Sequence, residues 1–141
     1  MKKSTNELFN EIMTAKDYES FRRENADNFT CMKLDRALMA KMEEKKLTKS
    51  DVIKGSGMAK TYAYQIFDGK KANPHIDKVL LLCIGMGLSI EETQNLLKVT
   101  GYRMLSPRDQ RDSYICYAIK NRMNIIDINL GLQELNLKIL E

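Results

Sequence analysis

The stretch "LTKSDVIKGSGMAKTYAYQIFDGKKANP", residues 47–74, decides the fold of this chain. Thr48 is suited to cap a short helix running to about Lys54, because its side-chain oxygen can accept a backbone N–H of the first turn. Leu47 can pack behind that cap. Gly57 then allows the chain to turn with a positive φ, which few other residues tolerate. The first half of the stretch therefore predicts a short helix that ends at a glycine corner.

A second short helix is predicted over about 60–67, and Gly69 ends it at the position after its C-cap. Helical periodicity places Ala63, Ile66 and Phe67 on one inward face. The opposite face, which we expect to be exposed, is formed by Lys60, Thr61, Tyr64 and Gln65. For Tyr62, the pattern leaves open a position in the core or at the wall of a groove.

Two short helices that cross at a glycine corner form a helix-turn-helix unit. On DNA, such a unit lays its second helix in the major groove, where the first residues of that helix touch base edges. The predicted exposed face supplies donors, acceptors and apolar contacts for this purpose. Lys70, Lys71 and Asn73 follow the helix, where they could contact phosphates and fix the docking register.

Together with "IDKVLLLCIGMGLSIEE" (76–92), this stretch resembles the Cro/C1-type helix-turn-helix domain of phage repressors and of the XRE family of transcriptional regulators. The resemblance covers about residues 31–97 and is carried by Leu47–Thr48, Gly57, Ile66 and "FDGKKANP". It implies a five-helix, lambda-repressor-like DNA-binding domain. The DNA-binding residues expected from the exposed face and from the resemblance are Lys49, Ser50, Lys60, Thr61, Tyr62, Tyr64, Gln65, Lys70, Lys71 and Asn73.

Two departures from the family pattern have physical consequences. Ile53 stands where the family usually has Ala, and Ala63 stands at the facing position, where it usually has Val or Ile. The exchange roughly conserves core volume, so we predict that Ile53 contacts Ala63. Lys49 stands where the family often has Gln, and lysine suits phosphate or guanine better than adenine. Sequence specificity therefore stays open.

The positive charge of the chain is concentrated on the same region. The net charge is +4, and residues 31–73 carry ten basic and five acidic side chains, whereas residues 74–141 carry eight of each. Localised positive charge is expected of a surface that binds phosphates. The alternative interpretation is a solvated, lysine-rich surface.

The helical period dominates the remaining sequence, and the predicted fold class is all-α. In the N-terminal part, a helix is expected over about 5–14, with Leu8, Ile12 and Met13 as its apolar stripe. A second is expected to start at Asp17 as N-cap and to direct Tyr18 and Phe21 toward the core. Residues 24–30 are predicted to be a loop.

A third helix is expected over about 31–46, with Leu34, Leu38 and Met42 buried. Pro74 suits the first turn of the next helix, and Ser89 begins a capping box for the one after it. Ser-Pro at 106–107 feeds a helix within 106–122, and Asn124 can cap a last helix. Ser89 and Asn124 lie 35 positions apart, which hints at stacked helical hairpins. The alternating charges of "RDQRD" (108–112) indicate a salt-bridged helix start rather than a nucleic-acid contact.

Other classes of protein find little support in the sequence. The apolar run 79–88 is too short to cross a bilayer, and the N-terminus lacks the apolar core of a signal peptide, so we expect a cytoplasmic protein. Cys31, Cys83 and Cys116 are expected to be buried, reduced thiols. With one histidine and no catalytic spacing of nucleophile, base or paired carboxylates, we expect no enzyme, no metal and no cofactor.

The sequence thus predicts an N-terminal helical extension (1–30), a DNA-binding domain (31–97) and a C-terminal helical extension (98–141) used for dimerisation or partner binding. The expected function is sequence-specific binding of double-stranded DNA by a homodimeric transcriptional regulator, since a single short helix reads too few bases. The rival interpretation is an interaction adaptor that has the fold but does not bind DNA.

Overall fold

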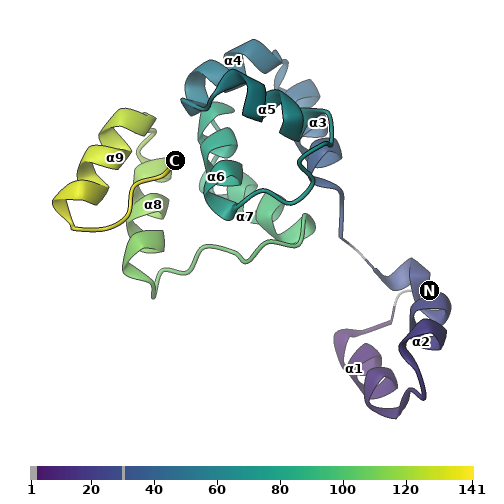
Figure 1. The fold of residues 1–141 in the computed structure, drawn as a ribbon. Helices are drawn as coiled ribbons and strands as arrows, with labels where there is room; N and C mark the ends of the chain where they lie inside the picture. Colours follow the sequence, from purple (N-terminus) through teal and green to yellow (C-terminus); the bar gives the residue numbers. More distant parts are fainter. Residues whose placement is uncertain (1–2, 30) are drawn as a thin grey trace. The chain divides into compact units, whose positions relative to one another are not determined.

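The computed structural model describes residues 3–29 and 31–141, and in those residues the chain is all-helical, without strands (Figure 1). It divides into two compact units, Met1–Cys31 and Met32–Glu141. Met1, Lys2 and Thr30 of the predicted N-terminal extension lie outside the described residues. The helices are α1 (Thr5–Thr14), α2 (Tyr18–Glu24), the 3-10 helix η1 (Ala26–Asn28), α3 (Leu34–Lys45), α4 (Lys49–Ser56), α5 (Lys60–Phe67), α6 (Ile76–Gly85), α7 (Ile90–Val99), α8 (Gln110–Lys120) and α9 (Ile125–Glu134).

The smaller unit is a helical hairpin with little buried apolar surface. Asp17 caps α2 as predicted, with its side chain accepting the backbone N–H of Ser20, and Phe21 is buried. Tyr18 was predicted to face the core, but it is 67% exposed. The apolar stripe predicted for α1 is not buried either, because Ile12 and Met13 are exposed and Leu8 is only half-buried. A hairpin this short has too few neighbours to cover both apolar faces.

The cysteines differ in their surroundings, contrary to the expectation that all three are buried. Cys83 is fully buried in α6, and burial raises the pKa of its thiol to about 12. Cys116 is half-buried in α8. Cys31 is exposed and precedes α3, which begins at Leu34 rather than at 31. Only Cys83 therefore meets the prediction in full.

The larger unit has one continuous apolar core, to which each of the helices from α3 to α9 contributes. The predicted stripe of α3 is confirmed, since Leu34, Leu38 and Met42 are all buried. α3 packs against α5, α4 against α6, α7 against both α6 and α8, and α8 against α9. Within the same core, α4 therefore packs mainly against α6, and α5 packs mainly against α3.

The contact between α4 and α6 depends on two glycines that face each other. A Cβ atom on Gly85 would lie 2.5 Å from the carbonyl oxygen of Val52, and one on Gly55 would lie 2.9 Å from the carbonyl oxygen of Gly85. Both distances are below any ordinary contact of a Cβ atom. The absence of side chains at these two positions is what lets the helix backbones approach.

The corners before α4, α7 and α9 share one local pattern. Each has a residue in the left-handed region, then an apolar residue, a capping residue and, three positions after the cap, an acid. The three capping residues, Thr48, Ser89 and Asn124, accept the backbone N–H of Asp51, Glu92 and Asp127 respectively. All three caps are predictions that the structure confirms. A local pattern of this kind sets the chain path without help from distant residues.

The hairpins α6–α7 and α8–α9 are also alike beyond their corners. After α7, the side-chain amide of Gln94 bonds both the N–H and the carbonyl of Leu105, at 2.8 and 2.9 Å. After α9, Asn129 makes the same pair of bonds with Leu140, at the same two distances. Asn129 and Leu140 each lie 35 positions after their counterparts. The two segments, 76–105 and 111–140, are therefore structural repeats, as the spacing of Ser89 and Asn124 hinted.

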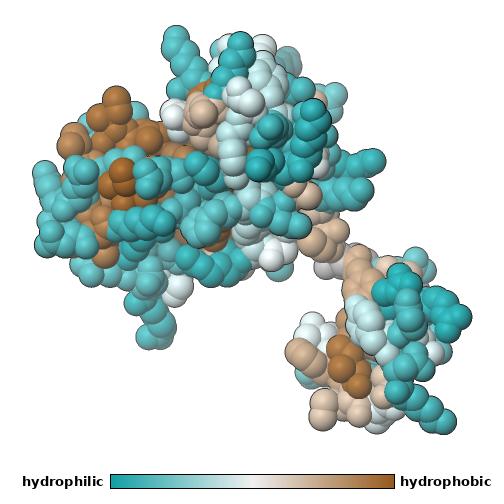
Figure 2. Space-filling model, viewed as in Figure 1, coloured by the Kyte–Doolittle hydropathy of each residue, from teal (hydrophilic) through white to brown (hydrophobic). Residues whose placement is uncertain are grey.

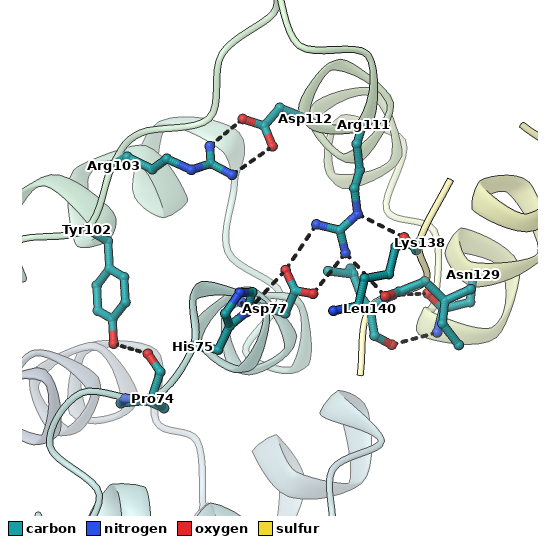
Figure 3. A network of polar contacts seen from close by, with 11 residues as sticks. Pro74, His75, Asp77, Tyr102, Arg103, Arg111, Asp112, Asn129, Lys138 and Leu140 are labelled. Atoms are coloured by element: carbon teal, nitrogen blue, oxygen red, sulfur yellow. Dashed lines mark hydrogen bonds and ion pairs between the residues drawn. The ribbon is translucent and has the colours of Figure 1, made fainter. Parts of the chain in front are cut away.

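Each repeat begins with a buried aspartate that an arginine neutralises (Figure 3). Arg111 makes a two-bond contact with Asp77, at 3.1 and 2.9 Å, and Arg103 contacts Asp112 at 2.6 Å. Arg111 also donates to the carbonyl of Lys138 at 2.8 Å. The predicted ion pairing of 108–112 is thus confirmed for Arg111 and Asp112, although their partners lie outside α8. Arg111 joins α6, α8 and the C-terminal segment.

Glu92 connects α7 to α3. Its carboxylate accepts the backbone N–H of Ser89 at 3.0 Å, and its other oxygen lies 3.0 Å from Lys41 Nζ and 3.1 Å from Lys45 Nζ. The hydrogen bond from Ser89, followed by those from the two lysines, lowers the pKa of Glu92 to about 2 against the opposing effect of burial. The ionised carboxylate is therefore favoured in the folded state.

We expect Glu92→Gln to destabilise the protein at neutral pH by on the order of 2 kcal/mol. Because the folded-state pKa lies below the ordinary value of 4.5, the contribution of the carboxylate is complete above that value. It is lost as the pH falls toward about 2, so the deficit of the variant should shrink over this range. Thermal melts at several pH values measure the effect, with Glu91→Gln at an exposed position as control. A deficit that is constant with pH would contradict this role.

Among the described residues, no helix combines the length and the apolar character that crossing a membrane requires.

Candidate nucleic-acid interface

The predicted outward face of α5 is exposed. Lys60, Thr61 and Tyr64 are exposed and Gln65 is half-buried, whereas Ala63, Ile66 and Phe67 are buried, as the helical period predicted. The helix begins at Lys60 and ends at Phe67, the predicted bounds. Gly69 follows its C-cap with a φ of +83°, a conformation that glycine adopts without strain. α5 therefore has one exposed polar face, and its opposite, apolar face is buried in the core.

The corner between α4 and α5 is held by its own hydrogen bonds. Ser56 is fully buried; its hydroxyl donates to the carbonyl of Ile53 at 2.8 Å and accepts the backbone N–H of Met58 at 3.1 Å. Gly57 has a φ of +69°, as predicted. Only Gly57, Met58 and Ala59 separate the two helices. The start of α5 thus has a fixed position relative to the end of α4.

Lys49 and Ser50 lie in the first turn of α4. Ser50 is exposed, and Lys49 is half-buried with its Nζ 6.0 Å from the centre of the Phe67 ring. The capping box of Thr48 and Asp51 fixes this turn. Lys49 therefore lies next to the end of α5, so the two helices can present one common surface.

Lys70, Lys71 and Asn73 are exposed in the loop that joins α5 to α6. The loop is tied down at its beginning, because the N–H of Lys71 donates to the carbonyl of Gln65 at 2.9 Å. At its end, the hydroxyl of Tyr102 donates to the carbonyl of Pro74 at 2.5 Å (Figure 3). The exposed side chains thus project from a backbone that is fixed on both sides.

Pro74 does not occupy the first turn of α6 as predicted. It is buried and precedes His75, the N-cap, whose Nδ1 accepts the backbone N–H of Asp77 at 3.1 Å. The bond from Tyr102 explains the position, because the carbonyl of Pro74 points to α7 and its following segment rather than into a helical turn. Tyr102 is a positioning residue that the sequence did not reveal.

The lysines of this surface lie beside aromatic rings. Lys60 Nζ lies 5.9 Å from the centre of the Tyr64 ring, and the Tyr62 ring has Lys71 and Lys78 near it. In the part of the chain that the structure describes, none of these three lysines makes an ion pair. Lys41 and Lys45, by contrast, are neutralised by Glu92. Positive charge without a carboxylate partner among the described residues therefore remains at Lys60 of α5 and at Lys71 of the following loop.

Lys78 on α6 belongs to the same surface, although the sequence analysis did not include it. Its position in a different helix from the motif concealed it, and only the three-dimensional contact with Tyr62 reveals it. Tyr62 itself is half-buried and packs against the core while its ring contacts the lysines. The predicted contact between Ile53 and Ala63 stays a prediction; Ala63 is fully buried, and half-buried Ile53 packs against the core.

The geometry contains groups that bind anions. Over residues 3–29 and 31–141, no set of three or more His, Cys, Asp or Glu side chains is arranged to hold a metal ion. Comparison with family models, with curated proteins and with solved structures found no match to this chain.

Proposed function

We propose that this chain is a sequence-specific DNA-binding transcriptional regulator of the Cro/C1 type, in which α3–α7 form the DNA-binding domain and α4–α5 its helix-turn-helix. The observation that carries the proposal is the outward face of α5, on which Lys60, Thr61 and Tyr64 are exposed next to a loop whose Lys71 has no carboxylate partner among the described residues. The activity is one of binding, with no catalytic step.

The two helices have features that a groove-binding pair needs. A three-residue corner with a left-handed glycine joins them, and the buried residues of α5 anchor it on the core. An exposed eight-residue helix fits the width of the major groove of B-DNA, where its first residues meet the base edges. In this proposal Lys49, Ser50, Lys60, Thr61, Tyr64 and Gln65 face bases and nearby phosphates, and Lys70, Lys71 and Asn73 contact the backbone.

We further propose that the regulator acts as a homodimer through its C-terminal helices. α9 carries Ile126, 73% exposed, and Leu130, 53% exposed, four positions apart on one helical face, with Tyr117 of α8 also exposed. Figure 2 shows apolar surface gathered over this part of the larger unit. Exposed apolar area of this kind is typical of an interface, and two copies would double the number of bases read. Light scattering of the purified chain measures the oligomeric state.

The base-reading role of α5 predicts a specific pattern of losses. Replacing Lys60 and Tyr64 together by alanine should lower affinity for the native upstream duplex about ten-fold more than affinity for random DNA, because base contacts carry discrimination. Replacing Lys70 and Lys71 together should weaken both and flatten the salt dependence, because phosphate contacts release counterions. Fluorescence anisotropy with the two labelled duplexes measures both effects. Equal losses from the two pairs on both duplexes would contradict the assignment.

The rival function is a protein–protein adaptor. The exposed apolar residues of the Met1–Cys31 unit and of α9 favour it, because both unit surfaces could contact another protein. An adaptor has no use for Lys60 on α5 and Lys71 after it, neither of which is paired with a carboxylate of the described residues. Absence of binding to any duplex at low salt would decide for the adaptor.

A further inference from the structure

Tyr62 lies beside two lysines that come from different parts of the chain. Its ring centre is 5.3 Å from Lys71 Nζ and 5.0 Å from Lys78 Nζ. Tyr62 belongs to α5, Lys71 to the following loop and Lys78 to the start of α6. The distance between the two ammonium groups cannot exceed the sum of the two ring distances. One aromatic ring therefore lies beside two positive charges from two backbone segments.

The positive charges of Lys71 and Lys78 are not neutralised by carboxylates of the described residues. The face of the ring attracts each ammonium group, but the two charges repel each other. In the described residues neither lysine has a carboxylate within ion-pairing distance. An anion that contacts both ammonium groups would remove the repulsion. The arrangement thus favours an anion that offers more than one oxygen atom as a hydrogen-bond acceptor.

The backbone on which these side chains stand is fixed in advance. The N–H of Lys71 is bonded to the carbonyl of Gln65, and the carbonyl of Pro74 is bonded to the hydroxyl of Tyr102. Lys78 lies in the first turn of α6, where its N–H donates to the carbonyl of the N-cap residue His75 at 2.9 Å. Binding therefore requires the ordering of two lysine side chains only, and their contact with the ring already restricts these.

We propose that Lys71 and Lys78 bind a backbone phosphate of duplex DNA together, and that Tyr62 positions both ammonium groups for it. A phosphodiester carries one negative charge on two non-bridging oxygens, which matches two ammonium donors. This inference rests on the proposed function and extends it by a binding residue on α6 and by a positioning role for Tyr62.

The test is the salt dependence of binding to a labelled random duplex by the full chain. Lys78→Ala should lower affinity several-fold at low salt and reduce the slope of log affinity against log salt by about one. Lys98→Ala, at an exposed position on α7 away from the Tyr62 ring, is the matched control and should leave the slope unchanged. Lys71→Ala should resemble Lys78→Ala.

The role of Tyr62 is separated from a merely structural one by a double-mutant cycle. Tyr62→Phe retains the ring and should bind as the unmodified chain does. In a Tyr62→Leu background, removal of Lys78 should cost less affinity than in the original chain, because the ammonium group is no longer held in place. Thermal melts establish that each variant folds. Should Tyr62→Leu not fold, Lys78→Ala against Lys98→Ala decides the proposal.

The outcomes distinguish this inference from the proposed function. If the unmodified chain binds duplex DNA and Lys78→Ala matches Lys98→Ala in affinity and slope, the phosphate site is wrong while DNA binding stands. If the unmodified chain binds no duplex at low salt, the proposed function is wrong and this inference is wrong with it. A loss of about one unit of slope for each lysine supports the site.

Discussion

Replacing Gly85 by alanine is expected to lower the free energy of unfolding by about 3 kcal/mol, although alanine is the better helix former by about 1 kcal/mol. The added Cβ would lie 2.5 Å from the carbonyl oxygen of Val52 and 2.8 Å from the backbone nitrogen of Ser56. Both are backbone atoms of α4, so no side chain can rotate away to make room. α4 and α6 must move apart, and their packed contact is lost.

Urea unfolding measures this effect, with Gly55→Ala and Asn95→Ala beside it. Gly55→Ala should cost less than Gly85→Ala, because its Cβ would lie 2.9 Å from the nearest atom, the carbonyl oxygen of Gly85. Asn95→Ala, at an exposed position on α7, should change stability by less than about 0.5 kcal/mol. If Gly85→Ala is as stable as Asn95→Ala, the close contact of α4 with α6 is wrong.

The same substitution should weaken DNA binding in molecules that remain folded. Ser56, whose hydroxyl holds the corner before α5, lies at the contact that Gly85→Ala would open. A displaced α4 moves Lys49 away from the ring of Phe67 at the end of α5. In the proposed function, reading bases requires α4 and α5 in one fixed arrangement. Gly85→Ala should therefore lower the affinity for DNA as well as the stability, although the substitution lies far from any base.

Local chemistry made several elements predictable from the sequence. The caps Thr48, Asp17, Ser89 and Asn124 were predicted because a capping side chain bonds within three residues of itself. The bounds of α5 followed from its apolar period and from Gly69. The prediction that Tyr18 faces the core was wrong for the opposite reason. The burial of Tyr18 depends on which other segments cover α2, and periodicity alone carries no such information.

Long-range contacts could not be predicted from the sequence. The meeting of Gly55 with Gly85 and the bond from Tyr102 to Pro74 join residues about thirty positions apart, and neither glycine nor tyrosine signals its partner in the sequence. For the same reason Lys78 was missing from the candidate site. The motif supplied the exposed face of α5, whereas the fold supplied the lysine of α6 that lies beside it.

Arg111→Ala is expected to destabilise the larger unit by about 3–5 kcal/mol, the usual cost of removing one partner of a buried ion pair. The side chain of Asp77 is 2% exposed and that of Arg111 is 18% exposed. Without the guanidinium group, Asp77 keeps only the longer contact to His75, at 3.8 Å, for its carboxylate. A buried carboxylate without a close partner is costly in a core.

The measurement is urea unfolding of Arg111→Ala, Asp77→Ala and the double variant. Because the unpaired charge causes most of the loss, the double variant should be less destabilised than the sum of the two single variants. Arg108→Ala is the matched control; Arg108 is exposed and lies three positions earlier in the sequence. Strict additivity, or a loss no greater than that of Arg108→Ala, would show that the pair contributes nothing.

Hydrogen exchange can locate the effect of Arg111→Ala within the chain. Arg111 also donates to the carbonyls of Lys138 and Ile139, at 2.8 and 3.2 Å, so its removal releases the segment after α9 as well as the start of α6. Asn129 still holds Leu140 from α9 itself. We therefore expect faster exchange in α8, α9 and the start of α6 while α3–α5 keep their protection, since none of the hydrogen bonds of Arg111 reaches those three helices. Uniform loss of protection would mean that both repeats and the helices before them unfold as one unit.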